Sequence, residues 1–448
     1  MLLSLLACVP VEGEAPKGEE LVTDLQVTLA EVPTVLWVRW TTAEPSRAVV
    51  QGTFGADVIV VEEREAVTDH EVLLAGFPAR TDVAVEVLLE GAEPATAAIT
   101  TGALPTWVPD LTYTADVPEL AAGGFVLAGV ISLDEGGVVA LDHAGRPVWA
   151  HTRIAESEGS VYRARMSLDG NAILYAGGAS AADTYGLFVR VPLDGSGVTT
   201  TPGLGTHTDF VELPSGGYAA LGWELRDYDG RTIVGDTIVE VGLDGTSHVV
   251  WSAFDDFSPN LDHEHPHWYS ADPDAEDWTH INGIAYDAAE DALYVTMTFN
   301  NSVARVDRGT GTLAWWLADA AGDFTRVGDG ELVSQPHSVQ RTPEGLLVFN
   351  RGNPADADTC SNATDIALDE ALGTAEQLDV YTSERCLLIP FLGSAQRLPG
   401  GNTLVSWTSA GQMDEVTPDG ELAWRVNTSA GFAFGFAEEV ATLGDGAP

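Results

Sequence analysis

The stretch Val303–Trp316, VARVDRGTGTLAWW, joins an apolar strand, a tight turn with Asp and Gly, and a closing strand that ends in Trp. The pattern recurs in VALDHAGRPVW (Val139–Trp149), VRVPLDGSGV (Val189–Val198), VEVGLDGTSHVVW (Val239–Trp251) and DEVTPDGELAW (Asp414–Trp424). The turn glycines are separated by roughly 50, 50, 66 and twice 55 residues, which leaves room for one unmarked copy near residue 370. Six copies of about 50 residues are typical of a six-bladed β-propeller.

A second element lies between these copies and reads as strand, tight polar turn, strand, the pattern of a β-hairpin. Its copies begin at Arg165, His207, His280, His337 and Gly393. These strands would be the innermost of each blade, so we expect His207, His280 and His337 to face one central channel. A lone histidine in a β protein is usually a structural or surface residue. Three at one repeat position favour a shared site, since the chain has only ten histidines.

The composition limits the class of protein. With 448 residues, 45% apolar content and 47 glycines, the chain can bury a large core and should hold more than one domain. No internal stretch reaches the roughly 20 apolar residues that span a bilayer. The formal net charge of -48 argues against a nucleic-acid partner, because such a surface repels phosphate. The acidic clusters Asp227–Gly230 and Asp356–Asp365 lack the EF-hand spacing, so the calcium signal is weak.

The N-terminus resembles part of a targeting signal. Leu5–Cys8, LLAC, resembles a bacterial lipobox, in which Cys8 is lipidated, although no basic region precedes it. Residues 1–20 would then be a signal remnant and a flexible tether. This predicts a lipid-anchored protein of the periplasm or cell surface, whose membrane contact is made only through the anchor. Cys360 and Cys386 would form a disulfide in such a compartment, with two free thiols as the alternative.

The chain divides by texture into two folded parts, both all-β. Residues 21–105 contain about seven short alternating strands with turn signals, which predicts a β-sandwich of fibronectin type III kind. WVRWTT (Trp37–Thr42) and the closing TTG resemble that family. Nothing in this part looks catalytic, so we interpret it as a spacer or docking module. Residues 106–448 form the predicted six-bladed propeller.

Several propeller segments resemble the bacterial arylsulfate sulfotransferase (ASST) family, a periplasmic six-bladed propeller behind a small β-sandwich. The resemblance covers roughly Thr112–Val426. Its specific parts are the His-x-Asn and Gln-x-His motifs that stand beside the generic turn-Trp pattern. The segments are DWTHINGIAYD (Asp277–Asp287), NSVARVDRGTGTLAWWL (Asn301–Leu317), QPHSVQRTPEGLLVFNRGN (Gln335–Asn353) and the region Gly393–Val426.

The resemblance implies a ping-pong transfer of a sulfuryl group from a phenolic sulfate ester to a phenol, without a nucleotide donor or a cofactor. His337 matches the histidine that attacks sulfur and carries the group, and His280 with Asn282 matches the His-x-Asn motif. His207 matches another axial histidine. His207 and His280 would donate hydrogen bonds or protons, and Asn282 would hold a sulfate oxygen. The chemistry fits, because sulfuryl transfer needs a neutral imidazole nucleophile and several hydrogen-bond donors around the sulfate oxygens.

One departure concerns the cation. The family places an arginine after the strand that follows His-x-Asn, where this chain reads Val295–Phe299, VTMTF. Arg351 stands in the segment FNRG where the family has Phe-Asp-Asn-Gly, and we expect it to supply the missing charge, with a changed substrate as the alternative. Arg163 and Arg165, at the start of an earlier inner strand, are further candidates, with surface positions as the alternative.

Aromatic residues near the expected mouth of the channel are candidates to bind the aryl ring. They are Trp268, Trp278 and Trp407, and blade packing is the alternative role for each.

Two other functions stay open. The propeller can bind a ligand or partner without chemistry, as a surface lipoprotein, because propellers serve both roles. A metal-dependent hydrolase could use the run DHEHPHW (Asp262–Trp268), whose alternate histidines are His263, His265 and His267. An exposed loop is the simpler interpretation of that run, and we assign no metal site.

Overall fold

The computed structural model describes residues 21–132, 135–154, 160–177, 185–262, 264–269, 272–319, 321–356 and 358–444. Two compact units divide the chain between Ala103 and Leu104. Within the described residues, no helix is long and apolar enough to cross a membrane.

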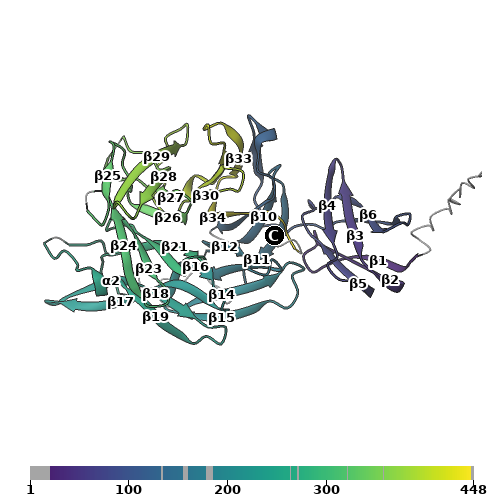
Figure 1. The fold of residues 1–448 in the computed structure, drawn as a ribbon, viewed down its shortest axis with the longest axis horizontal. Helices are drawn as coiled ribbons and strands as arrows, with labels where there is room; N and C mark the ends of the chain where they lie inside the picture. The colour runs from purple at the N-terminus through teal and green to yellow at the C-terminus, as the bar shows by residue number, and fades with distance from the viewer. Residues whose placement is uncertain are drawn as a thin grey trace, which may run out of the picture. The chain divides into compact units, whose positions relative to one another are not determined.

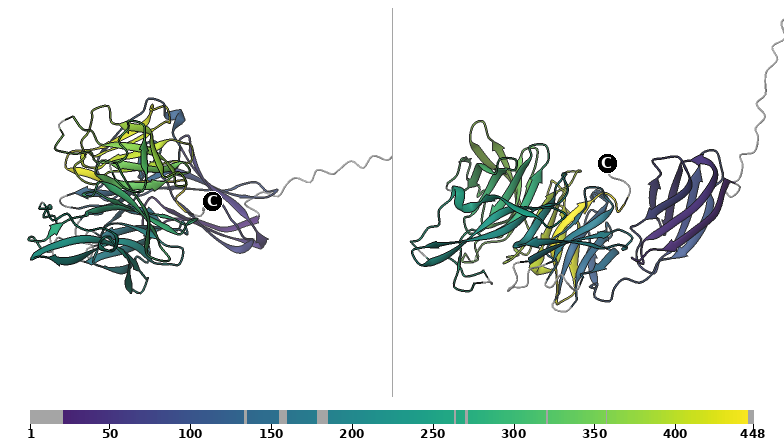
Figure 2. Two further views of the ribbon diagram at one scale, coloured as in Figure 1. Left: turned by 60° about the vertical axis from the view of Figure 1, so that its left-hand side comes forward. Right: turned by 90° about the horizontal axis from the view of Figure 1, so that it is seen from below.

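The first unit is built from two antiparallel sheets that share one core (Figures 1 and 2). One sheet orders β1 (Val22–Leu29), β2 (Leu36–Ser46) and β5 (Val67–Leu74), and the other orders β4 (Asp57–Glu62), β3 (Ala48–Phe54), β6 (Asp82–Leu89) and β7 (Ala95–Thr100). Alternate side chains of β2 and β6 are buried, among them Leu36, Val38, Val83 and Val85. This alternation is what a half-buried strand requires. The fibronectin type III relationship stays a prediction.

The second unit consists of six antiparallel sheets, each with a four-stranded path, and this confirms the all-β six-bladed propeller. The first three, from inner to outer strand, are β34 (Phe432–Val440), β9 (Phe125–Ser132), β10 (Gly137–Asp142), β11 (Pro147–Thr152); β12 (Ala164–Met166), β13 (Ala172–Gly177), β14 (Tyr185–Pro192), β15 (Thr199–Leu204); and β16 (Thr206–Glu212), β17 (Tyr218–Tyr228), β18 (Arg231–Val241), β19 (Ser247–Ser252).

The remaining sheets continue the same order (Figure 1). They are β21 (Ile281–Asp287), β22 (Ala292–Met297), β23 (Ser302–Asp307), β24 (Thr312–Ala318); β26 (Pro336–Arg341), β27 (Gly345–Asn350), β28 (Asn362–Asp369), β29 (Thr374–Thr382); and β30 (Ser394–Arg397), β31 (Thr403–Trp407), β32 (Gln412–Val416), β33 (Leu422–Thr428). The unmarked repeat copy is confirmed, because β28 and β29 turn at residues 370–373. We number these sheets as blades one to six.

Strands from both ends of the unit close the ring. The last strand, β34, pairs antiparallel with β9 and so supplies the inner strand of blade one. At the other end, β8 (Leu111–Thr114) pairs with β33 and extends the outer edge of blade six. The first strand of the unit is therefore hydrogen-bonded into the last blade, and the last strand into the first blade.

An insertion between blades three and four explains the long repeat step of 66 residues. It contains α2 (Ala253–Asp256) and β20 (Glu276–Asp277). β20 pairs in parallel with β18, where Val234 lies opposite Asp277. This pairing carries the residues just before β21 against blade three. A short strand between blades four and five, β25 (Thr325–Val327), pairs in the same parallel way with β29.

Candidate active site

The three predicted histidines all stand where an inner strand begins. His207 is in β16, His280 directly precedes β21, and His337 is in β26. In each case the pairing with the next strand shifts register beside the histidine, between His207 and Phe210, Ile281 and Gly283, and Pro336 and Ser338. Such β-bulges redirect side chains and are frequent next to active sites. The predicted placement at the inner strands is confirmed for all three.

The backbone beside each histidine is left-handed at a residue other than glycine. The φ angles are 52° at Thr208, 49° at His280 and 50° at Gln335. This conformation costs of order 1–3 kcal/mol and persists only where surrounding contacts hold it. Gln335 is held by its N–H, which donates to Asn301 Oδ1 at 2.5 Å, and by its carbonyl, which accepts from Arg351 N at 3.1 Å.

Blades four and five approach closely at Gly283. A Cβ atom at this position would lie 2.6 Å from the carbonyl oxygen of His337, so a side chain would displace the strand that carries the histidine. Asn282 strengthens the same junction: its Nδ2 donates to Thr298 Oγ1 at 2.8 Å, and Thr298 Oγ1 donates to Pro336 O at 2.8 Å. The structure thus places Asn282 in the support of His337.

His337 is the most isolated polar side chain of the site. It is 2% exposed, and neither ring nitrogen has a hydrogen-bond partner among the described residues. Burial, followed by the charges of Arg351 and His280, lowers the pKa of His337 well below its ordinary value. The imidazole is therefore neutral at neutral pH, and its lone pair is available to attack an electrophile.

His280 has the opposite electrostatic character. Its Nδ1 lies 2.6 Å from Asp277 Oδ2, which orients the ring. Burial opposes the charged form, but the hydrogen bond to Asp277 and the charges of Asp277 and Asp236 outweigh it and raise the pKa of His280. The ring stacks on Phe299 at 4.6 Å between centroids, with Trp268 edge-on at 5.2 Å. This histidine can hold a proton near neutral pH and deliver it through Nε2.

His207 contacts a second buried carboxylate. Its Nε2 lies 2.9 Å from Asp236 Oδ1, at ion-pair distance but without hydrogen-bond alignment. Its Nδ1 lies 3.1 Å from Thr208 Oγ1, and the ring stacks on Trp223 at 4.4 Å. His207 is thus held by Trp223 on one face and by Asp236 and Thr208 at its ring nitrogens, and its predicted role as a donor to substrate stays a prediction.

Arg351 is the cation next to this group. It is 6% exposed, Nη1 donates to Pro390 O at 3.0 Å, and Nη2 donates to Gln335 Oε1. Its Nε has no hydrogen-bond partner among the described residues. Burial lowers the pKa of Arg351, and its charge acts on both His337 and His280. A buried guanidinium with an unused donor is suited to an anion.

The predicted disulfide supports the segment that carries Arg351. Cys360 and Cys386 are bonded to each other, as expected. Ser361, next to Cys360, donates from Oγ to Arg351 O at 2.6 Å and accepts from Ile389 N at 2.8 Å. The crosslink therefore joins the two loops that hold the backbone and the Nη1 acceptor of Arg351.

The three candidate tryptophans lie in different environments. Trp268 is 55% exposed and packs edge-on against His280, so it can meet an aryl ring. Trp278 is 4% exposed in the hydrophobic core between blades three and four, and Trp407 is fully buried with its Nε1 bonded to Asp414. The expectation that Trp278 and Trp407 line the mouth was wrong, because both fill blade cores.

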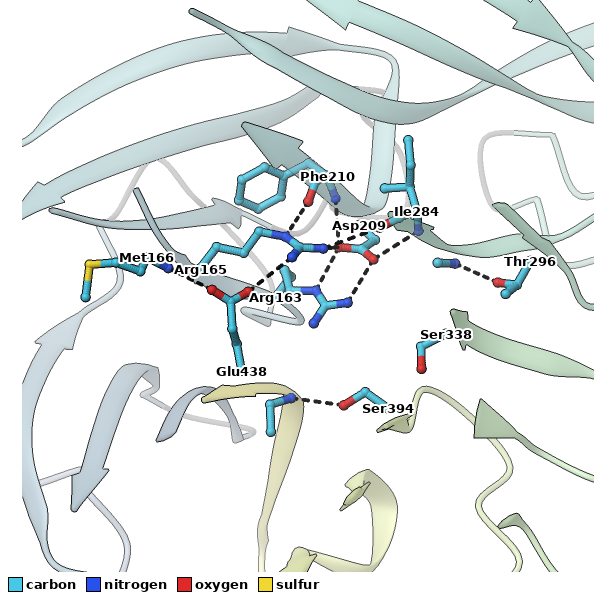
Figure 3. A network of polar contacts seen from close by, with 12 residues as sticks. Arg163, Arg165, Met166, Asp209, Phe210, Ile284, Thr296, Ser338, Ser394 and Glu438 are labelled. Carbon is cyan, nitrogen blue, oxygen red and sulfur yellow. Dashed lines mark hydrogen bonds and ion pairs between the residues drawn. The ribbon is translucent and has the colours of Figure 1, made fainter. Parts of the chain in front are cut away.

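Arg163 and Arg165 belong to a separate network on the axis (Figure 3). Arg163 binds Asp209 through Nε and Nη2 at 2.8 and 3.0 Å, and Arg165 Nη1 lies 3.1 Å from Glu438. Asp209 Oδ2 also accepts from Ile284 N at 3.1 Å, so the network ties inner strands of several blades together. These arginines are neutralised by carboxylates, and the structure does not bring them to the histidines.

A cavity of about 420 Å³ is lined mainly by residues of the inner strands. Arg165, Gln340, Gln396, Glu438 and Glu439 are among its lining residues. None of the three candidate histidines lines it. The histidine group and this cavity are therefore distinct places on the axis.

Two histidines of the run that suggested a metal site have other contacts. His265 Nε2 lies 2.8 Å from Asn260 O, while His267 contacts Ala275 O through Nδ1 and Glu264 through Nε2. His263, like Cys8, lies outside the described residues. Across the described parts of the chain, no group of three His, Cys, Asp or Glu side chains could hold a metal ion.

Sequence reasoning missed the carboxylates of the site. Asp277 stood in the motif DWTHIN, three residues before His280, and that spacing was a usable signal. Asp236, by contrast, comes from the middle of β18 and has no repeat signature.

Comparison with known proteins gives one family match. The family model described as arylsulfotransferase (ASST) matches residues 121–430. No curated protein matches the chain in sequence. Similar solved structures include a putative 6-phosphogluconolactonase from Bacteroides uniformis (13% identity, 68% of this chain and 82% of that chain, TM-score 0.41) and a catalytically inactive virginiamycin B lyase from Staphylococcus aureus (12%, 70% and 87%, 0.37). At these values the structural likenesses carry no argument about function.

Proposed function

Because the chain belongs to the arylsulfotransferase (ASST) family, we propose that it moves a sulfuryl group from a phenolic sulfate ester to a phenol, with His337 as the covalent carrier. The observation that carries the proposal is a buried, neutral imidazole without a hydrogen-bond partner among the described residues, beside the guanidinium of Arg351. A second histidine with a raised pKa, His280, stands close enough for its charge to act on the first.

In the first half-reaction, a ring nitrogen of His337 attacks the sulfur of the donor. An N–S bond forms, the bond between sulfur and the aryl oxygen breaks, and the electron pair leaves with the phenolate. Protonated His280 delivers its proton to this oxygen, so that a neutral phenol departs. The Asp277 carboxylate on Nδ1 keeps the ring oriented with Nε2 as the acidic position.

In the second half-reaction, the acceptor phenol uses the same position. Its oxygen attacks sulfur, the N–S bond breaks, and the electron pair returns to His337. His280 takes the phenol proton, which restores both histidines to their starting states. The balance needs neither a nucleotide nor an external oxidant or reductant, so the proposal requires no cofactor.

Arg351 takes the part of the anion clamp. The chain has Thr298 and Phe299 near the place where the family has its arginine, and Arg351 comes instead from the end of β27 in blade five. The fixed fork of its guanidinium suits sulfate oxygens. Phe299 and Trp268, both in contact with His280, would flank the aryl ring.

The proposal also includes an oxidising location outside the cytoplasm. The disulfide Cys360–Cys386 supports this, because such bonds persist mainly in exported proteins. The lipid anchor at Cys8 remains part of the same proposal.

The test is nitrophenolate release from p-nitrophenyl sulfate in the presence of phenol. We expect phenol-dependent turnover by the full chain, and its loss in His337→Ala. His248→Ala is the matched control, because His248 is a surface histidine whose side chain is 69% exposed. Folded protein without turnover across a panel of phenols would refute the proposal, as would a fully active His337→Ala variant.

A further inference from the structure

Asp236 is a buried carboxylate that joins two of the candidate histidines. It comes from β18 in blade three and is 1% exposed. Oδ1 lies 2.9 Å from His207 Nε2 in the same blade. Oδ2 accepts from Ile281 N at 3.0 Å and from the hydroxyl of Thr279, both next to blade four.

These contacts bracket His280. Thr279 precedes it and Ile281 follows it, so a single carboxylate oxygen holds the chain on both sides of a left-handed residue. Thr279 Oγ1 is held twice, because it also accepts from Asp236 N at 2.8 Å. Parallel pairing of β20 with β18 brings the segment to this place.

We infer that Asp236 is a positioning residue for the transfer, which holds the His280 backbone in its left-handed conformation and contacts His207. The inference rests on the proposed function and adds a residue to it. Asp236 would not touch the substrate. It would act on His280 through hydrogen bonds to the two neighbouring residues and through its charge. It would act on His207 by direct contact.

The charged groups around Asp236 determine which titrations should change when its charge is removed. His207 faces Oδ1, while Asp277 and His280 follow on the neighbouring segment, and Arg351 acts on His280 from blade five. The Asp236 charge contributes to the raised pKa of both His280 and Asp277. Its loss should make His280 release its proton at lower pH.

Asp236→Asn tests the charge, because the amide keeps an oxygen that can accept from Thr279 and Ile281. We expect kcat to fall about 10–100-fold, by analogy with residues that orient the side chains bound to a metal, with KM changed less. The alkaline limb of the kcat profile should move to lower pH, because His280 must be protonated to assist the leaving phenolate.

Thr279→Val tests the geometry, because it removes the hydroxyl and leaves the carboxylate charge. We expect a lower kcat with the alkaline limb moved less than in Asp236→Asn, and Thr279→Ser should restore the rate. Asp414→Asn is the control for losing any buried carboxylate. Asp414 lies in blade six, where it accepts from Trp407, Gln412 and Arg425. This control should leave the pH limb in place.

The titration of His280, followed by NMR of histidine-labelled full-length protein and assigned with His280→Gln, separates this inference from the proposed function. If Asp236→Asn lowers the titration midpoint of His280 and changes the chemical shifts of the His207 ring nitrogens, then Asp236 positions both histidines. This conclusion holds even if the wild-type protein transfers no sulfuryl group. Unchanged titrations overturn the inference whether or not the protein is active. In an active protein, an Asp236→Asn variant with wild-type kcat and pH limb overturns it as well.

Discussion

Replacing Arg351 with methionine tests whether its guanidinium holds the sulfuryl oxygens. Arginine has five N–H donors, and protein oxygens of Pro390 and Gln335 take two of those of Arg351. Its Nε has no partner among the described residues and is left for a bound anion. Losing even one donor to a developing oxyanion costs about 3–4 kcal/mol, or roughly 10²–10³-fold in rate. We therefore expect Arg351→Met to lower kcat/KM by about 10²–10³-fold.

The assay is the initial rate of nitrophenolate release from p-nitrophenyl sulfate at several phenol concentrations. Arg351→Lys keeps the charge but loses the planar fork, and we expect it to retain more activity than Arg351→Met. Arg326→Met serves as the control, because Arg326 is a partly exposed arginine paired with Asp319. Thermal unfolding of each variant checks that the loss of the Pro390 contact has not unfolded the site.

A second readout comes from the acid limb of the pH profile. The charge of Arg351 contributes, after burial, to the lowered pKa of His337. Arg351→Met should therefore raise that pKa, so that the nucleophile becomes protonated and inactive at a higher pH than in the wild type. If folded Arg351→Met keeps an activity within about threefold of wild type, the loss is far smaller than the loss expected for one missing donor. That result would refute the role of Arg351 as the anion clamp. An unmoved acid limb would refute the electrostatic part.

Three further predictions follow from the same contacts. The wild-type kcat/KM should stay constant across neutral pH. It should fall at a pH below the ordinary histidine pKa, where His337 becomes protonated, and at a pH above that value, where His280 loses its proton. A pH profile with only one limb would contradict the two roles. Replacing Cys360 and Cys386 with serine should lower the free energy of unfolding by about 3–4 kcal/mol for a loop closed over 26 residues, measured by urea titration, and an unchanged midpoint would contradict this. Trp268→Ala should raise KM for aryl sulfates by about tenfold with a smaller change in kcat, because the ring is exposed beside His280; an unchanged KM would remove it from the aryl site.

The repeated parts of the fold could be predicted from the sequence. A turn glycine and a closing apolar strand recur because each blade solves the same packing problem, so even the unmarked copy at residues 370–373 could be located by period alone. His207, His280 and His337 could be predicted as a group for the same reason, since equivalent positions in successive blades must converge on one axis.

Other parts of the site could not be predicted because they depend on contacts between blades. Asp236 reaches His207 within its own blade and Ile281 in the next, and no spacing in the sequence encodes that distance. Trp268 and Trp278 lie in the same insertion, yet Trp268 is exposed and Trp278 fills a core. Tertiary packing decides this difference. Arg163 had the right strand position but meets Asp209, which neutralises it.

The closure of the ring by β34 makes the propeller dependent on the last part of its chain to be synthesised. Until Phe432–Val440 has left the ribosome, the backbone edge of β9 has no partner, although every other strand of blade one already exists. The pairing of β34 with β9 joins residues about 300 positions apart, and such contacts form slowly. Until they form, the unpaired edge of β9 can pair with a strand of another chain. The same closure places the natural break of the circle within blade one, so that circular permutants opened between two other blades should preserve every blade while changing the order in which they emerge.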